Sequence, residues 1–282
     1  MLHAETFLSL LKRSPKLLIG ITIILSIISF SLIGLATAKH GPLDMVDLED
    51  LPPSPEHPLG TDGFGRDLYV EVSYGILNSL RIGVMAGLAA TLIGVAIGAT
   101  AGFKGGIIDE TLNLITNIIL VIPTFPLLIV IGSYMHVRNE YVLSLLIAII
   151  SWPWTARAVR SQTYSIKTRD FIDVARISGL KDPELIVWDI LPNMLSYIVM
   201  AFALQMGGAI VSEAGLSMLG LGPTETVTLG MILRWALTWE AYRRGDWWWI
   251  TPPGLIITLL SVSLLLINTG LDEVFNPRLR RG

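Results

Sequence analysis

The chain has 282 residues, of which 52% are hydrophobic and only 15% are charged, and its mean hydropathy is +0.63. A composition this apolar excludes an ordinary soluble domain and is typical of an integral membrane protein. The net charge of −3 decides little, whereas the absence of cysteine excludes disulfide bonds, thiol catalysis and cysteine metal sites.

Six apolar segments are long enough to cross about 30 Å of hydrocarbon, which takes about 20 helical residues. They lie at residues 17–35, 80–102, 112–131, 142–159, 194–211 and 250–269. Basic residues precede the first segment and Ala36-Thr37-Ala38 resembles a cleavage site, but the apolar run exceeds the usual 7–15 residues of a signal peptide. We therefore expect a retained anchor and an all-α protein with six transmembrane helices.

The distribution of basic residues predicts the orientation of these helices. With the N-terminus inside, 13 of the 20 lysine and arginine residues fall on the inner side and 7 on the outer side. Basic residues gather on the cytoplasmic side of a membrane. We therefore expect both termini and the loop at 160–193 to be cytoplasmic, and residues 39–79 to lie outside.

The predicted outer loop is rich in proline and acidic residues, which favours an extended, turn-rich path. His57 lies in it, and none of the four histidines is paired at metal-ligand spacing, so a structural histidine is the better interpretation. Residues 102–106 read Gly-Phe-Lys-Gly-Gly, which lacks the spacing of a P-loop and predicts a tight turn between two membrane helices. Because no other segment has a P-loop, the energy source of any active process must lie on another polypeptide.

The third segment carries polar residues followed by two prolines: Asn113, Thr116, Asn117, Pro123 and Pro126. Proline removes a backbone donor, and such breaks persist in membranes where neighbouring helices or pore water satisfy the freed groups. These five residues are candidates for a hinged, pore-lining helix. Polar packing between helices explains the asparagines and the threonine equally well, and both interpretations stay open.

The inner loop is predicted to contain two short helices. Thr168 or Asp170 can cap the first, Gly179 supplies a left-handed stop, and Asp182 followed by Pro183 is a strong restart. The first helix carries a stripe of residues at helical spacing: Phe171, Val174, Ala175 and Ser178. The second helix carries an apolar patch of Leu185, Ile186 and Trp188, and Pro192 ends its backbone hydrogen bonding. Such a capped, half-apolar pair favours a docking site for a soluble partner. An amphipathic connector at the membrane surface is the alternative.

Two features mark the end of the fifth segment and the loop after it. An unpaired carboxylate is costly in a membrane, so we expect neighbouring backbone or an arginine to hold Glu213, rather than a substrate. Five tryptophans follow, at positions 235, 239, 247, 248 and 249. An aromatic belt at the outer interface accounts for most of them, and a site that stacks sugars or peptides is the alternative.

Several motifs, in order along the chain, resemble those of ABC-transporter permeases of the dipeptide/oligopeptide group. They are His57-Pro58-Leu59-Gly60-Thr61-Asp62, Gly65-Arg66-Asp67, Ser79-Leu80-Arg81-Ile82-Gly83, Asp109-Glu110 after the glycine turn, Glu213-Ala214-Gly215-Leu216-Ser217-Met218-Leu219-Gly220-Leu221-Gly222, and Asn276-Pro277-Arg278-Leu279-Arg280. The inner loop is similar to the EAA loop that grips the ATPase, because Gly179, Leu191 and Pro192 keep its spacing after Asp173-Val174-Ala175. Asp173 and Val174 depart from the family's Glu and Ala, as does Asn117 from its usual Asp.

The resemblance identifies the chain as a second, C-type permease of the dipeptide/oligopeptide/nickel importer group, with the type I ABC importer permease (MetI-like) fold and cytoplasmic coupling helices. It divides the chain into a first segment and helix (1–38), an extracytoplasmic loop (39–78), a five-helix permease core (79–270) with a coupling loop at about 160–193, and a cytoplasmic tail (271–282). It implies an ATPase-coupling role for Asp173, Ala175, Gly179, Asp182, Pro183, Leu185, Trp188, Leu191 and Pro192.

The resemblance also implies the chain's partners: a second permease subunit in a heterodimer, two ATP-binding subunits and an extracytoplasmic solute-binding protein, in the cell membrane and without nucleic acid. ATP and Mg would sit on the ATPases, and this chain would bind no cofactor and catalyse no reaction. The alternative function is an ion-gradient-driven transporter or channel. The central parts of the six segments contain no Asp, Glu, Lys, Arg or His, which speaks against proton coupling and leaves sodium coupling open. The substrate, whether peptide, oligosaccharide or nickel, does not follow from the sequence.

Overall fold

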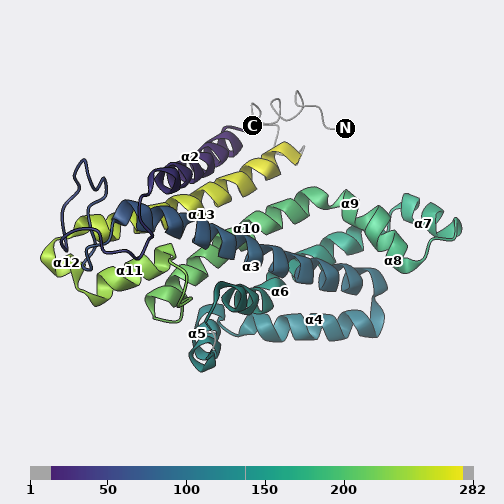
Figure 1. Cartoon of the computed structure of the whole chain (residues 1–282). Coiled ribbons are helices and arrows are strands. Elements are labelled where there is room, and N and C mark those ends of the chain that lie inside the picture. Colours follow the sequence, from purple (N-terminus) through teal and green to yellow (C-terminus); the bar gives the residue numbers. More distant parts are fainter. Residues whose placement is uncertain (1–13, 137, 276–282) are drawn as a thin grey trace.

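The computed structural model describes residues 14–136 and 138–275, and in these ranges the chain is helical apart from its connections (Figure 1). Five helices are long and apolar enough to cross a membrane: α2 (Pro15–Thr37), α3 (Leu68–Lys104), α6 (Glu140–Lys167), α10 (Leu195–Met218) and α13 (Trp247–Phe275). The bent pair of α4 (Gly106–Val121) and α5 (Thr124–Tyr134) supplies a sixth span if it is counted as one. The shorter helices are α7 (Asp170–Ile177), α8 (Asp182–Glu184), the π-helix η1 (Leu185–Ile190), α9 (Leu191–Asn193), α11 (Leu229–Thr238) and α12 (Ala241–Arg244).

Several helices extend beyond the apolar segments that predicted them. Helix α3 begins at Leu68, where the Asp67 carboxylate accepts hydrogen bonds from the first-turn amides, so the last part of the segment 39–78 is helical. Helix α6 continues to Lys167, past the expected start of the inner loop at 160, and α13 continues past residue 270 to Phe275. Hydropathy marks only the part of a helix that needs hydrocarbon, whereas hydrogen bonding continues as far as a cap allows. The predicted motif at 276–280 lies outside the described residues.

Helix α3 forms the centre of the fold because its glycines allow direct backbone contact with its neighbours. A Cβ at Gly94 would lie 2.9 Å from the carbonyl oxygen of Trp152 in α6, and one at Gly102 would lie 2.5 Å from that of Arg160. On the side of α10, a Cβ at Gly87 would lie 2.8 Å from the amide nitrogen of Met206. Small residues at such positions let membrane helices approach closely, which strengthens van der Waals packing where no hydrophobic force acts between them.

The third predicted span is broken rather than hinged. Helices α4 and α5 meet at an angle of 85°, and Pro123 is the N-cap of α5. Pro126 falls in the first turn of α5, where amide groups have no partner within the helix in any case. The predicted break in the third segment is therefore confirmed, and both prolines lie at the start of the second of the two helices that it separates.

Residues 38–67, here called the cap loop, cover one end of the molecule and pack against α11, α12 and the start of α13 (Figure 1). Trp249 is fully buried there, and a Cβ at Gly63 would lie 2.8 Å from its ring. The Trp248 indole donates a hydrogen bond to the Thr61 carbonyl oxygen at 3.3 Å. Phe64 of the cap loop packs edge to face against Trp239 at 4.8 Å between ring centroids, and the Arg66 guanidinium lies 4.9 Å from the centre of the Trp235 ring. Four of the five tryptophans therefore contact the cap loop, and Trp247 is the one left for the predicted aromatic belt.

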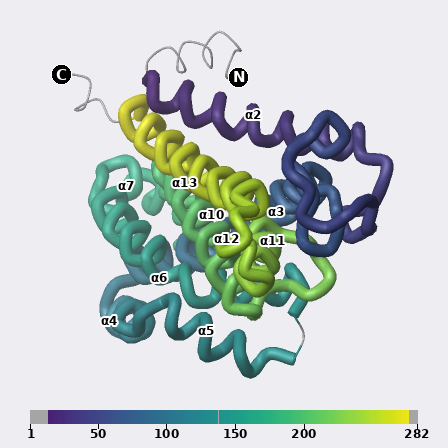
Figure 2. Tube along the Cα trace, turned by 90° about the vertical axis from the view of Figure 1, so that its left-hand side faces the viewer, coloured from purple at the N-terminus to yellow at the C-terminus, as the bar shows by residue number. Residues whose placement is uncertain are grey.

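Helices α2 and α13 lie side by side, on the outside of the packing of α6 and α10 around α3 (Figure 2). A Cβ at Gly20 would lie 2.7 Å from the Ser263 carbonyl oxygen. At the end away from the cap loop, Glu273 accepts hydrogen bonds from Ser14 at 2.6 Å and Lys16 at 2.5 Å. The start of α2 and the end of α13 therefore lie together, at the opposite end of these helices from the cap loop.

Candidate functional site

Helices α7 to α9 project from the end of the molecule opposite the cap loop (Figure 1). The predicted break between the two helices is confirmed at Gly179, whose φ is +92°. Its amide donates to the Arg176 carbonyl at 3.0 Å, and the Leu180 amide donates to that of Ala175 at 3.3 Å. A glycine in the left-handed conformation ends a helix without a Cβ penalty, and these two bonds satisfy carbonyls that the helix leaves free.

The predicted caps of this helix pair are wrong. Helix α7 has no side-chain cap, and the Thr168 hydroxyl instead donates to the Ser165 carbonyl. At the second helix the N-cap is Lys181, whose amide donates to the Glu184 carboxylate at 2.7 Å. Asp182 accepts a 2.6 Å hydrogen bond from Lys104 at the end of α3, and that bond holds the pKa of the Asp182 carboxyl below its ordinary value. Asp182 thus links the projecting segment to α3.

Three fully buried side chains anchor the projecting segment to the membrane helices. Ile172, Leu185 and Ile190 form one cluster with Val159 of α6 and Phe103 of α3, among others. Leu185 and Ile190 are five residues apart and reach the same side because η1 is a π-helix, in which bonds join residues i and i+5. The sequence pattern missed both Ile172 and Ile190, for different reasons. It placed the buried stripe of α7 at Phe171 and Val174, whereas the structure buries Ile172, and it assumed a period of 3.6 residues for the π-helical stretch that ends at Ile190.

The opposite surface of the projecting segment is apolar and exposed. The side chains of Ile177, Trp188 and Val174 are 87%, 72% and 63% exposed, and Phe171, Leu180 and Val187 extend this surface, here called the apolar face. The predicted patch on the second helix is therefore divided, with Leu185 inward and Trp188 outward. The remaining candidates around it are exposed or partly buried: Asp173, which pairs with Arg176 at 3.6 Å, Ala175, Pro183, Leu191 and Pro192. An exposed apolar surface on a firmly anchored segment is suited to contact another protein.

The candidate pore-lining residues do not gather in one place. Thr116 is buried and donates to the Leu112 carbonyl of its own helix, while the Asn117 side-chain oxygen accepts a 2.7 Å hydrogen bond from Arg157 of α6. Asn113 is partly buried, and Pro123 and Pro126 are exposed. Asn117 therefore joins α4 to α6, and Arg157 remains exposed beside it.

Glu213 is fully buried and is held by hydroxyl groups, not by backbone or an arginine as the sequence suggested. Ser217 and Thr228 donate to one carboxylate oxygen at 2.6 and 2.7 Å, and Ser79 of α3 donates to the other at 3.3 Å. Thr228 also caps α11 by accepting from the Met231 amide. The carboxylate thus ties α3, α10 and the start of α11 together, which is a structural role.

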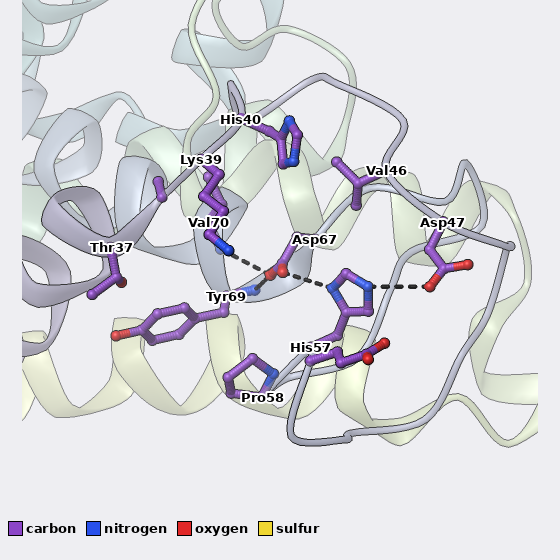
Figure 3. Close-up of a pocket in the computed structure, with 12 residues that line it drawn as sticks. Thr37, Lys39, His40, Val46, Asp47, His57, Pro58, Asp67, Tyr69 and Val70 are labelled. Atoms are coloured by element: carbon purple, nitrogen blue, oxygen red, sulfur yellow. Dashed lines mark hydrogen bonds and ion pairs between the residues drawn. The ribbon is translucent and has the colours of Figure 1, made fainter.

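His57 belongs to a pocket of about 450 Å³ beneath the cap loop (Figure 3). Its ring lies between two carboxylates, 2.7 Å from Asp67 and 3.4 Å from Asp47. Burial lowers the pKa of His57, but the hydrogen bonds and charges of Asp67 and Asp47 outweigh it and leave the pKa raised. Because Asp67 also caps α3, His57 joins the cap loop to the start of that helix, in line with the structural role expected for it.

Comparisons with known proteins agree with these features. Residues 94–281 match the family model of the binding-protein-dependent transport system inner membrane component. The chain is 32% identical over 275 residues to a dipeptide transport system permease protein of Bacillus subtilis, covering 96% of this chain and 84% of that one. It is 34% identical over 236 residues to an oligopeptide transport system permease protein of Mycobacterium tuberculosis, covering 82% and 80%. A chain of the methionine ABC transporter MetNI in an inward-facing conformation superposes with a TM-score of 0.55 at 20% identity, covering 72% and 93%.

Proposed function

This chain belongs to the family of binding-protein-dependent transport system inner membrane components, and we propose that it forms half of the pathway through which peptides or a related small solute are imported. As a permease of an ABC importer it is the non-catalytic subunit and works with ATPases and a binding protein. We propose that the second half of the pathway is a different permease, and that ATP and Mg are held by the ATPases.

The observation that carries this proposal is the apolar face on the projecting segment. Ile172, Leu185 and Ile190 anchor the segment, and the Lys104–Asp182 pair links it to α3. Movement of a protein bound to Ile177 and Trp188 would therefore be passed to the membrane helices rather than absorbed by a loose loop. We assign this surface to contact with the ATPase. Peptide as substrate is supported by the relatives, which are permeases of dipeptide and oligopeptide transport systems.

We further propose that both chain ends and the projecting segment are cytoplasmic, and that the cap loop faces the binding protein. Since the chain contains no cysteine, single cysteines at Ser54 and Lys181 will report their sides without background labelling. Both positions are exposed. In intact cells, an impermeant thiol reagent is expected to label Ser54→Cys and to spare Lys181→Cys until the membrane is opened. Equal labelling of the two from outside would refute this orientation.

The coupling role is tested by Gly179→Val. Valine at a φ of +92° is strained by about 1–3 kcal/mol, so the turn that places the apolar face will distort, while no neighbouring atom lies within 4 Å to disturb the rest of the fold. We expect ATPase binding and peptide uptake by the complete importer to fall at least about fivefold, with normal membrane insertion.

Gly179→Asn is the matched control for that experiment, because asparagine tolerates the left-handed conformation. It is expected to keep most of the uptake. Trp188→Ser, which removes an exposed ring without touching the turn, should also weaken ATPase binding, whereas Ile107→Ser at the equally exposed start of α4 should not. Unchanged recovery of the ATPase with both Gly179→Val and Trp188→Ser would exclude the apolar face as the coupling surface.

A further inference from the structure

A small pocket of about 180 Å³ opens where α6 and α10 meet, and it is lined by Trp154, Leu204 and Gln205. Trp154 is the fifteenth of the 28 residues of α6 and Gln205 the eleventh of the 24 residues of α10, so the pocket lies near the middle of both spans. The Trp154 side chain is 49% exposed. One turn along α10, Gly208 has no atom within 4 Å of the place where a Cβ would be, so the surface beside the pocket is also open. We call this site the midspan pocket.

The orientation of the Gln205 amide in the midspan pocket is fixed. Its Nε2 donates to the Ser151 carbonyl oxygen at 3.0 Å and to the Thr155 hydroxyl at 2.8 Å. Because the Ser151 carbonyl can only accept, the amide nitrogen must face α6 and Oε1 must point away from that carbonyl. Among the described residues, no group donates to Gln205 Oε1 and none accepts from the Trp154 indole nitrogen. The lining therefore carries one unpaired acceptor and one unpaired donor.

Such a surface does not suit contact with lipid chains. An unpaired amide oxygen or indole N–H in hydrocarbon costs free energy, and tryptophan in membranes is enriched at the interfaces rather than at the centre. Arg157 lies one turn beyond Trp154 on the same side of α6 and is exposed, with Asn117 as its partner. Polar groups thus continue from the middle of the span toward the end that carries the projecting segment. This side of α6 is suited to a path filled by water and solute.

We infer that the midspan pocket binds the backbone of an extended peptide as it passes through the importer. A peptide group offers one N–H, which donates to Gln205 Oε1, and one carbonyl, which accepts from the Trp154 indole. These contacts involve only the peptide backbone and so do not discriminate between peptide sequences. The face of the indole packs against the neighbouring side chain of the peptide, whatever its type. The site is a weak contact along the path, since conduction requires that a solute can leave as well as enter. This inference rests on the proposed function, because it takes peptide as the solute.

The first test is Trp154→Phe, which keeps an aromatic ring and removes only the donor. In the complete importer in proteoliposomes, with a mixture of radiolabelled tri- to penta-alanine, we expect the number of peptides imported per ATP to fall about fivefold. ATP hydrolysis stimulated by the binding protein should change less than about twofold, because the coupling segment is untouched. A residue that only packs would alter uptake and hydrolysis together. Trp247→Phe, at the 60% exposed tryptophan near the cap loop, is the matched control and should behave as wild type.

The second test is photocrosslinking during turnover, with benzoylphenylalanine in place of Trp154 or of Leu145. Leu145 is 54% exposed on the same helix, and nine residues of α-helix place it about 180° away from Trp154. We expect ATP-dependent labelling by the alanine peptides at 154 and none at 145. Labelling by lipid alone at 154, or unchanged uptake by Trp154→Phe while wild type imports peptide, would overturn the midspan pocket and leave the proposed function standing. Failure of wild type to import any of the peptides would overturn the midspan pocket and peptide as the solute, and would leave a related small solute as the cargo of the proposed importer.

Discussion

Leucine at Gly98 is expected to prevent α3 from packing against α6. A Cβ at this position would collide with the Ala156 carbonyl oxygen and lie 3.0 Å from the Arg160 amide nitrogen, and both are backbone atoms that cannot rotate away. Inserting a larger side chain into a packed core costs about 1–3 kcal/mol when the neighbouring side chains can move aside. A collision with backbone atoms costs more, because these atoms cannot move aside. Because α3 and α6 together hold the projecting segment, we expect almost complete loss of folded protein.

The yield of monodisperse protein in detergent and its thermal unfolding measure this effect. Gly254→Leu is the matched control, because the same side chain is added within span α13 where no atom lies within 4 Å of the Cβ position. We expect the control to be recovered at close to wild-type yield. A Gly98→Leu protein with wild-type yield and melting temperature would show that α3 and α6 do not approach in the membrane as described.

The existence of the spans could be predicted from the sequence, but their ends and their closest contacts could not. The hydropathy of a segment depends only on its own residues, so a long apolar run can be recognised in the sequence as a membrane span. The start of α3 depends on a cap at Asp67 that His57 holds in place, and the break between α4 and α5 depends on how Pro123 is oriented. The atoms that a side chain at Gly98 would contact belong to another helix. A glycine in an apolar run therefore does not reveal which helix packs closely against it.

The candidate site also combines features that could be predicted from the sequence with features that could not. Gly179 was predictable because the left-handed conformation is a property of the residue itself. Asp182 was mistaken for a cap because Lys104, its actual partner, lies 78 residues away in the sequence. Glu213 likewise finds its hydroxyl donors on three elements, and the sequence suggested other partners. The conformational preference of a residue can be predicted from the sequence. Which of several possible hydrogen-bond partners a side chain contacts depends on the tertiary structure.

Glutamine and tryptophan in the middle of a span are also ambiguous before the fold is known. Gln205 would pass for polar packing between helices, and its Nε2 does serve that purpose. Only the direction of its second polar atom, together with the exposure of Trp154, separates a packing residue from one that faces a solute. The same ambiguity left the role of Asn117 open, and its side-chain oxygen accepts a hydrogen bond from Arg157, which lies along the path that we propose.

The purified chain alone is expected to show no ATP hydrolysis and no ATP-stimulated uptake. It contains no nucleotide-binding motif, and a gate that alternates between inward and outward states needs an input that favours the two states differently. In our proposal that input reaches the apolar face from the ATPases and the cap loop from a loaded binding protein. Both activities should therefore appear only when the second permease, the two ATPases and the binding protein are added to proteoliposomes.

Omitting one component at a time separates the contributions to that activity. Without the binding protein we expect only basal hydrolysis and no uptake, and without the second permease we expect neither, because half of the pathway and one of the two docking surfaces are then missing. The Gly179→Val protein should reproduce the result of omitting the ATPases while all components are present. Robust uptake by the isolated chain under an ion gradient, without ATP, would instead support the secondary-transporter alternative. The central parts of the spans contain no ionisable side chain that could couple to protons, so we expect uptake under a proton gradient to be absent. Amide and hydroxyl oxygens could still bind sodium, so a sodium gradient is the decisive arm of this test.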